Sequence, residues 1–236
     1  MRLLCLNVID HTPSGHGSRM VRNDASLNDL ATVAFIDLAG FSAITGVFGD
    51  HAAVAMLQHF EGLVAEALKS HAPPIKWIGD EVMLSFPDPK TAIRALGLLL
   101  PACRQDPRLP LTRTSLHHGP VVRRGGDLFG STVNIAARIA ALAKPGQLIA
   151  TRPVAEAAVQ EGITLRDLGE TSLRSFPDKM RLYEISLSQT ADPAWIDPVC
   201  KMHAPYESYQ RAAPSGPWFC SKQCEEAFLR SPETYT

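Results

Sequence analysis

The sequence of 236 residues has no long hydrophobic run and no strong charge of either sign. No apolar stretch approaches the roughly 20 residues that a helix needs to cross a bilayer, so no membrane span is expected. The formal net charge of −1 gives no reason to expect binding to nucleic acid or to an anionic membrane. Residues 3–9 are apolar except Asn7, and this stretch is too short and broken for a secretory signal. The hydrophobic content of 45% is ample for a core. Because neither a membrane span nor a secretory signal is expected, we expect a cytoplasmic protein.

Cysteine is scarce, and its positions are uneven. Of the five cysteines, three crowd towards the C-terminal end at Cys200, Cys220 and Cys224, which indicates a metal site rather than disulfides. Pro193 and the polar run 188–192 before it mark a linker. The predicted organisation is a leader (1–29), a large domain (30–188), a linker (189–196) and a small unit (197–236).

The region 31–42, Ala-Thr-Val-Ala-Phe-Ile-Asp-Leu-Ala-Gly-Phe-Ser, predicts a buried strand, a turn and the start of a helix. Asp37 ends the strand, Gly40 lets the backbone pass close to another group, and Ser42 can cap the helix. An acid at the mouth of a buried strand, beside free amides at a helix start, suits a metal ion that carries phosphate. The alternative is a surface aspartate that only caps a helix.

A second acid lies in the region 76–86, which predicts a strand, a tight turn and another strand. Gly79-Asp80 is a hairpin dipeptide, so Asp80 is expected at the tip, free of the ladder of its own strand. If this strand neighbours the one that ends at Asp37, two carboxylates converge and can bind Mg²⁺ with phosphate oxygens. For this pair of residues alone, an ordinary hairpin is the simpler interpretation.

The order of the expected elements predicts an α/β sandwich of the ferredoxin-like βαββαβ type. One helix is expected from Phe41 to His71, with a buried face made of Val54, Leu57, Phe60, Val64 and Leu68. Further helices are expected at 88–104, after a cap at Ser131 or Thr132, and at 151–160. A strand at 111–117 should turn at Gly119-Pro120, and a hairpin at 167–184 should close the sheet.

Three motifs together resemble the class III nucleotidyl cyclases. They are Phe-x-Asp-x-x-Gly-Phe-Ser at 35–42, Lys-x-x-Gly-Asp-x-x-Met at 76–83 and Asp-x-x-Gly-x-x-Val-Asn-x-Ala-x-Arg at 127–138. The resemblance covers about residues 30–188 and implies the same sandwich fold. It also implies a site for two Mg²⁺ or Mn²⁺ ions. The metal ligands would be the Asp37 and Asp80 carboxylates and the backbone of Leu38, and Gly40, Phe41 and Ser42 would bind phosphate.

The same resemblance implies roles for four more side chains. Arg138 matches the arginine that stabilises charge on the α-phosphoryl group, and Asn134 matches the asparagine that orients the ribose. Lys76 and Asp127 match the purine-reading pair and favour ATP, because lysine donates to adenine N1 and aspartate accepts from the N6 amino group. The alternative for all four is a set of solvated surface charges and turn residues.

In this family the metal aspartates come from one subunit, and the purine pair with the asparagine and arginine from the other. The chain carries both sets, which implies a homodimer.

The family often has a basic side chain that binds phosphate near the end of the domain. This sequence has no clear match to it, and Arg174 and Lys179 are the alternatives. Gly125-Gly126-Asp127-Leu-Phe also resembles the loop of diguanylate cyclases, but Leu128 stands where that family has glutamate. A catalytically silent, cyclase-like sensor remains the alternative function.

The tail, from Asp197-Pro-Val-Cys200 onward, resembles the YHS domain, a relative of the TRASH metal-binding modules. The pair Cys220 and Cys224 lies at an expected helix start, where two sulfurs face one way. Three thiolates suit Zn²⁺ or Cu⁺, with His203 or Asp197 as a fourth ligand. The alternative is a small interaction module with three reduced, packed cysteines.

Overall fold

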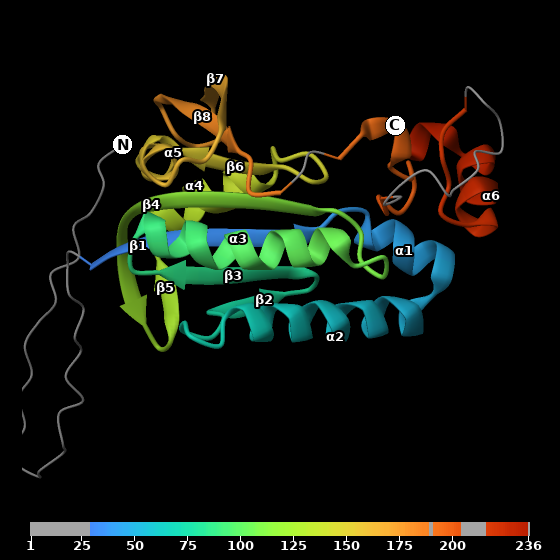
Figure 1. Ribbon diagram of the computed structural model, residues 1–236, viewed down its shortest axis with the longest axis horizontal. Coiled ribbons are helices and arrows are strands. Elements are labelled where there is room, and N and C mark those ends of the chain that lie inside the picture. Colours follow the sequence, from blue (N-terminus) through green and yellow to red (C-terminus); the bar gives the residue numbers. More distant parts are fainter. Residues whose placement is uncertain (1–28, 189–190, 204–215, 236) are drawn as a thin grey trace, which may run out of the picture.

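The computed structural model describes residues 29–188, 191–203 and 216–235, which are arranged around one eight-stranded sheet (Figure 1). The strands are β1 (Asp29–Leu38), β2 (Lys76–Ile78), β3 (Glu81–Phe86), β4 (Thr112–Arg124), β5 (Asp127–Phe129), β6 (Leu148–Thr151), β7 (Leu165–Ser172) and β8 (Lys179–Ile185). The helices are α1 (Phe41–Phe48), α2 (Asp50–Ala67), α3 (Pro89–Gln105), α4 (Ser131–Ala140), α5 (Arg152–Gln160) and α6 (Lys222–Arg230). Two short 3₁₀ helices, η1 (Pro193–Trp195) and η2 (Pro232–Thr234), lie in the tail. Residues 1–28 of the predicted leader (1–29), with Cys5, lie outside the described residues, and Asp29 is the first residue of β1.

The strand order is β2-β3-β1-β4-β6-β8-β7, with β5 paired to β4. Strand β1 lies between β3 and β4 and is antiparallel to both, while β6 runs parallel to β4. This mixed sheet with helices on both faces confirms the predicted α/β sandwich.

Side chains of β1 alternate between two apolar cores. Ala34, Ile36 and Leu38 are buried with residues of α2, α3 and α5 on one face of the sheet. Val33 and Phe35 are buried on the other face, where α4 packs. This alternation follows from the two-residue period of a strand. It leaves Asp37 in phase with Val33 and Phe35, at the end of the strand on the α4 side.

The predicted helix 41–71 is wrong, because the chain breaks at Gly49 into α1 and α2. Gly49 has φ 83°, which a side chain would disfavour, and its amide caps α1 by donating to the carbonyl of Thr45. The predicted core face is correct for Phe60, Val64 and Leu68. Val54, in contrast, is 52% exposed, because it lies in the same helix as Phe60 but six residues earlier, about 120° around the helix from that buried face.

The predicted helix caps are also wrong. Gly40 precedes α1 and Gly130 precedes α4, and neither helix has a side-chain cap from Ser42, Ser131 or Thr132. Thr132 Oγ1 instead donates to the carbonyl of Pro120 at 2.6 Å, which ties α4 to β4.

Gly119-Pro120 does not turn the chain, and β4 continues through it to Arg124. A Cβ at Gly119 would lie 2.7 Å from Thr132 Oγ1, so glycine is needed there for the close approach of α4. The hairpin that was expected at 167–184 is present as β7 and β8.

The tail packs against α1 at one end of the sheet (Figure 1). Ile44 of α1 is buried with Val199, Cys200 and Cys224 in one apolar cluster. The large unit and the described part of the tail therefore share a core, while the sequence boundaries between them stay a prediction.

Candidate functional site

The structure brings Asp37 and Asp80 together. Asp37 lies at the end of β1, opposite Glu81 in the β1–β3 ladder, and Asp80 lies in the turn that leads into β3. The Asp80 carboxyl is within hydrogen-bonding reach of the Asp37 carboxyl. Two acids from separate motifs thus meet at one end of the central strands.

The electrostatics of this acidic site favour a cation. Burial, followed by the charge of Asp37, raises the pKa of Asp80 to about 6. Burial and then the charges of Asp37 and Asp80 raise the pKa of Glu81 to about 7. Three carboxylates face one guanidinium, that of Arg113, whose Nε donates to Asp37 Oδ2 at 2.8 Å. The excess of negative charge fits a divalent metal ion, which carboxylate oxygens bind well.

Sequence reasoning missed Arg113 and Glu81. Arg113 pairs with Asp37 across the β1–β4 ladder, and Glu81 pairs with it across the β1–β3 ladder. Their positions in the site follow from the register of the paired strands, which the sequence does not show. The only indication in the sequence is that Glu81 directly follows Asp80.

The turn Leu38–Ser42, called the phosphate turn below, leads from β1 into α1. Gly40 has φ 77°, the left-handed conformation that glycine adopts without strain. The first amides of α1 have no intrahelical acceptor and can donate to an anion. The amide of Ala39 is already engaged, because it donates to the carbonyl of Leu111 at 2.9 Å. The available donors are therefore those from Gly40 onward, and these include the predicted phosphate-binding residues Gly40, Phe41 and Ser42.

Lys76 and Asp127 form an ion pair, with Lys76 Nζ 2.7 Å from Asp127 Oδ2. They come from β2 and β5, which are separated by 51 positions in the chain and are not neighbours in the sheet. The hydrogen bond from Lys76, helped by the amide of Leu128, lowers the pKa of Asp127. The two residues of the predicted purine pair are thus side by side.

Asn134 and Arg138 lie on the exposed face of α4, while Ile135 and Ile139, which directly follow them, are buried against the sheet. Their spacing of one helical turn places both side chains on one surface strip. Arg174 and Lys179, the two alternatives for a phosphate-binding base, are also exposed.

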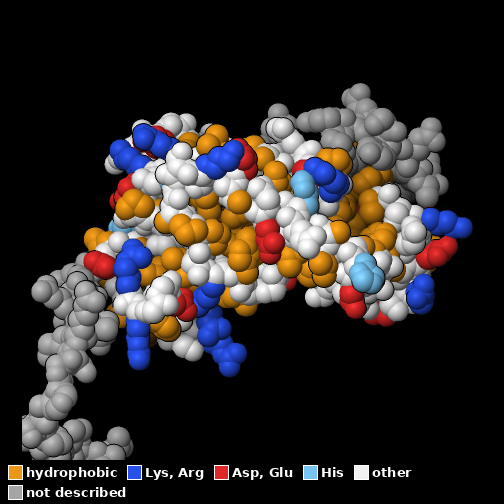
Figure 2. All heavy atoms as spheres, turned by 90° about the horizontal axis from the view of Figure 1, so that it is seen from below, with side chains coloured by type: hydrophobic (Ala, Val, Ile, Leu, Met, Phe, Trp, Pro, Cys, Tyr) orange, Lys and Arg blue, Asp and Glu red, His pale blue; other side chains and the backbone are white. Residues whose placement is uncertain are grey.

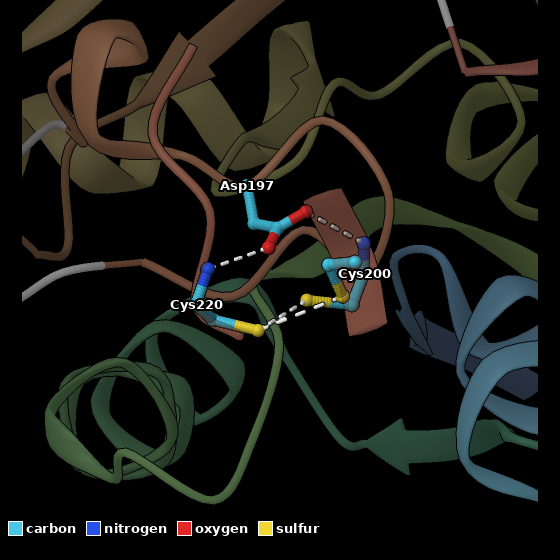
Figure 3. Close-up of side chains that lie close together, drawn as sticks. Asp197, Cys200 and Cys220 are labelled. Carbon is cyan, nitrogen blue, oxygen red and sulfur yellow. Dashed lines mark hydrogen bonds between the residues drawn. The ribbon is translucent and has the colours of Figure 1, made fainter. Parts of the chain in front are cut away.

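Four donor side chains of the tail form a second cluster: Asp197, Cys200, Cys220 and Cys224, whose ligand atoms all lie within 4.8 Å of one another. Figure 3 shows Asp197, Cys200 and Cys220 pointing towards one another. The Sγ atoms of Cys200 and Cys220 are 3.3 Å apart, and those of Cys220 and Cys224 are 3.7 Å apart. A tetrahedral zinc with Zn–S bonds of about 2.3 Å would hold its sulfurs about 3.8 Å apart, so the donor set fits a metal.

Of the two alternatives for a fourth ligand, Asp197 lies in the cluster and His203 does not. His203 Nε2 instead lies 3.4 Å from Arg104 Nη2. The Asp197 carboxylate accepts hydrogen bonds from the amides of Val199 and Cys220, both at 2.7 Å. Asp197 thereby holds together the two segments that carry the cysteines.

The pKa values of the thiols in the cluster shift in opposite directions. Hydrogen bonds from Cys200 and then from Cys220 lower the pKa of Cys224 to about 4. The corresponding bonds raise the pKa of Cys200. Cys224 lies in the first turn of α6, where the helix dipole also favours a thiolate. One thiolate is therefore available as a metal ligand at neutral pH.

Beyond these two clusters, the surface is mixed in charge. On the face in Figure 2, Lys and Arg side chains are interspersed with acidic and hydrophobic ones. Val122 and Phe129 are cross-strand neighbours on the β4–β5 arm and are 41% and 48% exposed. Among the helices of the described residues, none has the length and apolarity that a bilayer crossing requires.

Comparison with curated proteins gives adenylate cyclases. The chain is 34% identical over 167 residues to a pH-sensitive adenylate cyclase of Mycobacterium tuberculosis, a match that covers 67% of this chain and 41% of the relative. It is 31% identical over 131 residues to an adenylate cyclase of Streptomyces griseus, covering 55% of this chain and 33% of that protein. The chain thus spans less than half the length of these relatives. No protein-family model matches it.

Comparison with solved structures gives the same class of fold. Adenylyl cyclase CyaB from P. aeruginosa superposes with a TM-score of 0.58 at 21% identity, covering 68% of this chain and 95% of that one. An adenylate cyclase from Trypanosoma brucei gives a TM-score of 0.62 at 18% identity, with coverage of 72% and 96%. The guanylate cyclase domain of RhGC from Catenaria anguillulae gives 0.56 at 19% identity, with coverage of 67% and 97%. The covered part of the chain therefore has the fold of class III nucleotidyl cyclase catalytic domains, and about three tenths of the chain lies outside each superposition.

Proposed function

We propose that this protein is an adenylate cyclase that converts ATP to 3′,5′-cyclic AMP and pyrophosphate. The observation that carries the proposal is the convergence of Asp37 and Asp80 beside the phosphate turn. The curated relatives named adenylate cyclase support the same activity. This chain covers only part of each, so the activity is inferred from the site as well as from the names.

In the proposed mechanism, the protein positions charges rather than forming covalent bonds. Two Mg²⁺ or Mn²⁺ ions at Asp37, Asp80 and the Leu38 carbonyl would lower the pKa of the ribose 3′-hydroxyl and neutralise the leaving pyrophosphate. Amides of the phosphate turn hold phosphate oxygens at the start of α1.

Three further side chains act on the reacting end of the nucleotide. The Arg113 guanidinium, which now contacts Asp37, is a permanent cation at the phosphate end of the site. Asn134 orients the ribose so that its hydroxyl is in line with the α-phosphorus. Arg138 stabilises the charge that builds on the α-phosphoryl oxygens in the transition state.

Lys76 and Asp127 select adenine. In the proposed complex Lys76 donates to N1 and Asp127 accepts from the N6 amino group. Their ion pair at 2.7 Å supports this role, because it holds a donor and an acceptor side by side before the base arrives. Guanine has a donor at N1 and an acceptor at O6, so both contacts would be mismatched, at a cost of a few kcal/mol.

The proposed active form is a homodimer, in which one subunit supplies Asp37 and Asp80 and the other supplies Asn134, Arg138 and the purine pair. Two observations support it. Asn134 and Arg138 are exposed rather than enclosed within the site of their own chain. The exposed apolar neighbours Val122 and Phe129 on the β4–β5 arm offer a surface that a second copy would bury.

For the tail we propose a metal-binding module of the YHS kind, loaded with Zn²⁺ or Cu⁺. The packing of three sulfurs and the Asp197 carboxylate within 4.8 Å supports it. Metal analysis of the wild type beside Cys220→Ser tests this proposal, and equal metal content in the two proteins would contradict it.

Turnover with Mn²⁺-ATP tests the cyclase proposal against a catalytically silent sensor. Purified protein, shown to be dimeric by light scattering, should form cyclic AMP and pyrophosphate in equal amounts. A matched Asp80→Asn protein is the blank. A proven dimer that makes no cyclic AMP would favour the silent sensor.

A further inference from the structure

Two backbone hydrogen bonds connect the tail to the phosphate turn through Leu111. The amide of Leu111 donates to the carbonyl of Lys201 at 3.1 Å, and the carbonyl of Leu111 accepts from the amide of Ala39 at 2.9 Å. Lys201 directly follows Cys200 of the cysteine cluster. One residue therefore separates the tail's cluster segment from the turn that starts α1.

The same tail segment also contacts the phosphate turn sterically. A Cβ at Gly40 would lie 3.1 Å from the carbonyl carbon and oxygen of Cys200 and 3.1 Å from Cγ of Lys201. Gly40 is thus covered on one side by the tail and has no room to shift in that direction. Ile44, one turn further along α1, is completely buried against Val199, Cys200 and Cys224.

The cysteine cluster in turn fixes the conformation of this segment. The amide of Lys201 donates to the carbonyl of Asp197 at 3.0 Å, and Lys201 has φ 56°, a backbone conformation that needs support in a residue other than glycine. Asp197 and Cys200 belong to the cluster, so a bound metal would fix both ends of the loop that presents the Lys201 carbonyl. The tail already packs on α1 through one apolar cluster, and a bound metal would add a second constraint on this loop.

From these contacts we infer that the tail positions the phosphate turn, and that metal in the cluster of Asp197, Cys200, Cys220 and Cys224 strengthens nucleotide binding at the catalytic site. This inference rests on the proposed cyclase function. With metal bound, the Lys201 carbonyl holds Leu111, and Leu111 holds the turn in the conformation that receives phosphate. Without metal, the turn must be ordered by the nucleotide itself, which weakens binding.

Hydrogen exchange of the whole protein tests the structural half of this inference. Zinc-loaded and zinc-stripped samples are compared over peptides that contain Ala39 and Leu111. Stripping should speed exchange at these two amides about tenfold, because their shared support is lost. Peptides from 148–160, in β6 and α5, should be unchanged. Unchanged exchange at Ala39 and Leu111, with loss of zinc demonstrated, would overturn the inference.

Two variants separate metal loss from general destabilisation. Cys220→Ser removes a partly buried ligand and should reproduce the exchange pattern of the stripped protein. Cys103→Ser changes a buried thiol of α3 outside the cluster. This variant should keep its zinc, and hydrogen exchange at Ala39 should stay as slow as in the loaded wild type. If Cys103→Ser gave the same local pattern while retaining zinc, the effect would not be transmitted from the cluster, and the inference would be wrong.

Zinc affinity tests the functional half, because coupling between two sites is reciprocal. Zinc is titrated against a chromophoric chelator, with excess Mg²⁺, in the presence or absence of an ATP analogue whose α–β phosphate bridge cannot be cleaved. Cys220→Ser serves as the blank for zinc bound elsewhere. The analogue should tighten zinc binding about tenfold. Unchanged zinc affinity at a concentration of analogue that saturates the protein overturns the inference.

The kinetic counterpart is a change in KM rather than kcat. Stripping zinc should raise KM for Mn²⁺-ATP about tenfold and change kcat less than about twofold, since binding and not the chemical step is affected. A loss confined to kcat would contradict the inference. If the loaded protein makes no cyclic AMP at all, the proposed function fails, while the exchange measurement still decides whether the tail positions the turn.

Discussion

Arg113 donates to Asp37 across the β1–β4 ladder, Nε to Oδ2 at 2.8 Å, so the group of three carboxylates carries its own cation. A metal ion and this guanidinium compete for one carboxylate. The competition makes separate predictions for metal binding and for nucleotide binding.

Arg113→Ala should therefore have opposite effects on the two ligands. Without the guanidinium, Asp37 is free, and Mn²⁺ alone should bind several-fold more tightly. ATP should bind more weakly, with KM raised about tenfold, because a cation for the phosphates is lost. Calorimetry with Mn²⁺ and initial rates with ATP measure the two effects. Weaker Mn²⁺ binding in Arg113→Ala would contradict the competition. Arg123→Ala, in an exposed ion pair with Asp29, is the control.

The two acids should be essential for turnover. Asp37→Asn and Asp80→Asn each keep the shape of the side chain but remove a charge that the metal ions need, so kcat should fall roughly a thousandfold. Rates of cyclic AMP formation with saturating Mn²⁺ provide the measurement. Asp167→Asn changes an exposed carboxylate on the β7–β8 hairpin and should keep the wild-type rate. A rate for Asp37→Asn within tenfold of wild type would show that the site has been misassigned.

Exchange of the purine pair should change the substrate. Lys76→Glu combined with Asp127→Cys reverses the donor and acceptor that face the base, so the ratio of kcat/KM for ATP over GTP should fall at least about a hundredfold. Competition between the two nucleotides gives this ratio directly. The same kind of double change in the exposed pair Arg181 and Asp167 should leave the ratio unaltered. An unchanged preference for ATP would remove Lys76 and Asp127 from base recognition.

The stability of the protein should depend on the partly buried histidine His117. Burial lowers the pKa of His117 to about 4, and its Nδ1 lies 2.7 Å from Thr151 Oγ1. The unfolded chain binds a proton at this residue near pH 6.5, whereas the folded chain does not until about pH 4. The contribution of neutral His117 to the free energy of unfolding is therefore fully present above pH 6.5. It is lost as the pH falls to about 4, and the loss is at most about 3 kcal/mol.

Urea unfolding of the wild type and of His117→Gln between pH 4 and pH 7 checks this prediction. The variant should show a shallower loss of unfolding free energy in that range. His51→Gln removes an exposed histidine and should follow the wild type. Equal slopes for wild type and His117→Gln would contradict the assignment.

The parts of the site that sequence alone could predict are those set by local patterns. Asp37 lies near the end of a strand that the largely apolar run 31–36 predicts, and Asp80 occupies a Gly-Asp turn, so each could be placed before its partner was known. Arg113 and Glu81 could not, because their roles depend on which strands pair and in which register. Lys201 and Leu111 are 90 positions apart in the chain and are joined by a main-chain hydrogen bond. Main-chain atoms are the same in almost every residue, so the residue types do not indicate this contact.

Local sequence patterns also predicted wrong helix boundaries where a glycine, rather than a capping side chain, sets the boundary. Ser42 and Thr132 fit the rules for helix caps, but Gly40 and Gly130 hold those positions with φ 77° and 123°. Gly49 broke a helix whose apolar spacing looked continuous. In each case the backbone conformation of a glycine decided the element boundary, and a pattern of side chains cannot report it.

Complementation between two inactive variants tests the homodimer and the division of the site between subunits. Asp37→Asn lacks a metal ligand, and Arg138→Ala lacks the arginine of the opposite half-site. A mixed dimer contains one site with both defects and one with neither, because each complete site draws one set from each subunit. After equal mixing and exchange of subunits, activity should recover to about a quarter of wild type, since about half of the dimers are mixed and each has one good site. Phe129→Glu on both chains places a charge on the exposed β4–β5 arm and should abolish the recovery by preventing assembly, as seen by light scattering. No recovery from a mixture shown to contain mixed dimers would mean that each subunit builds its site alone.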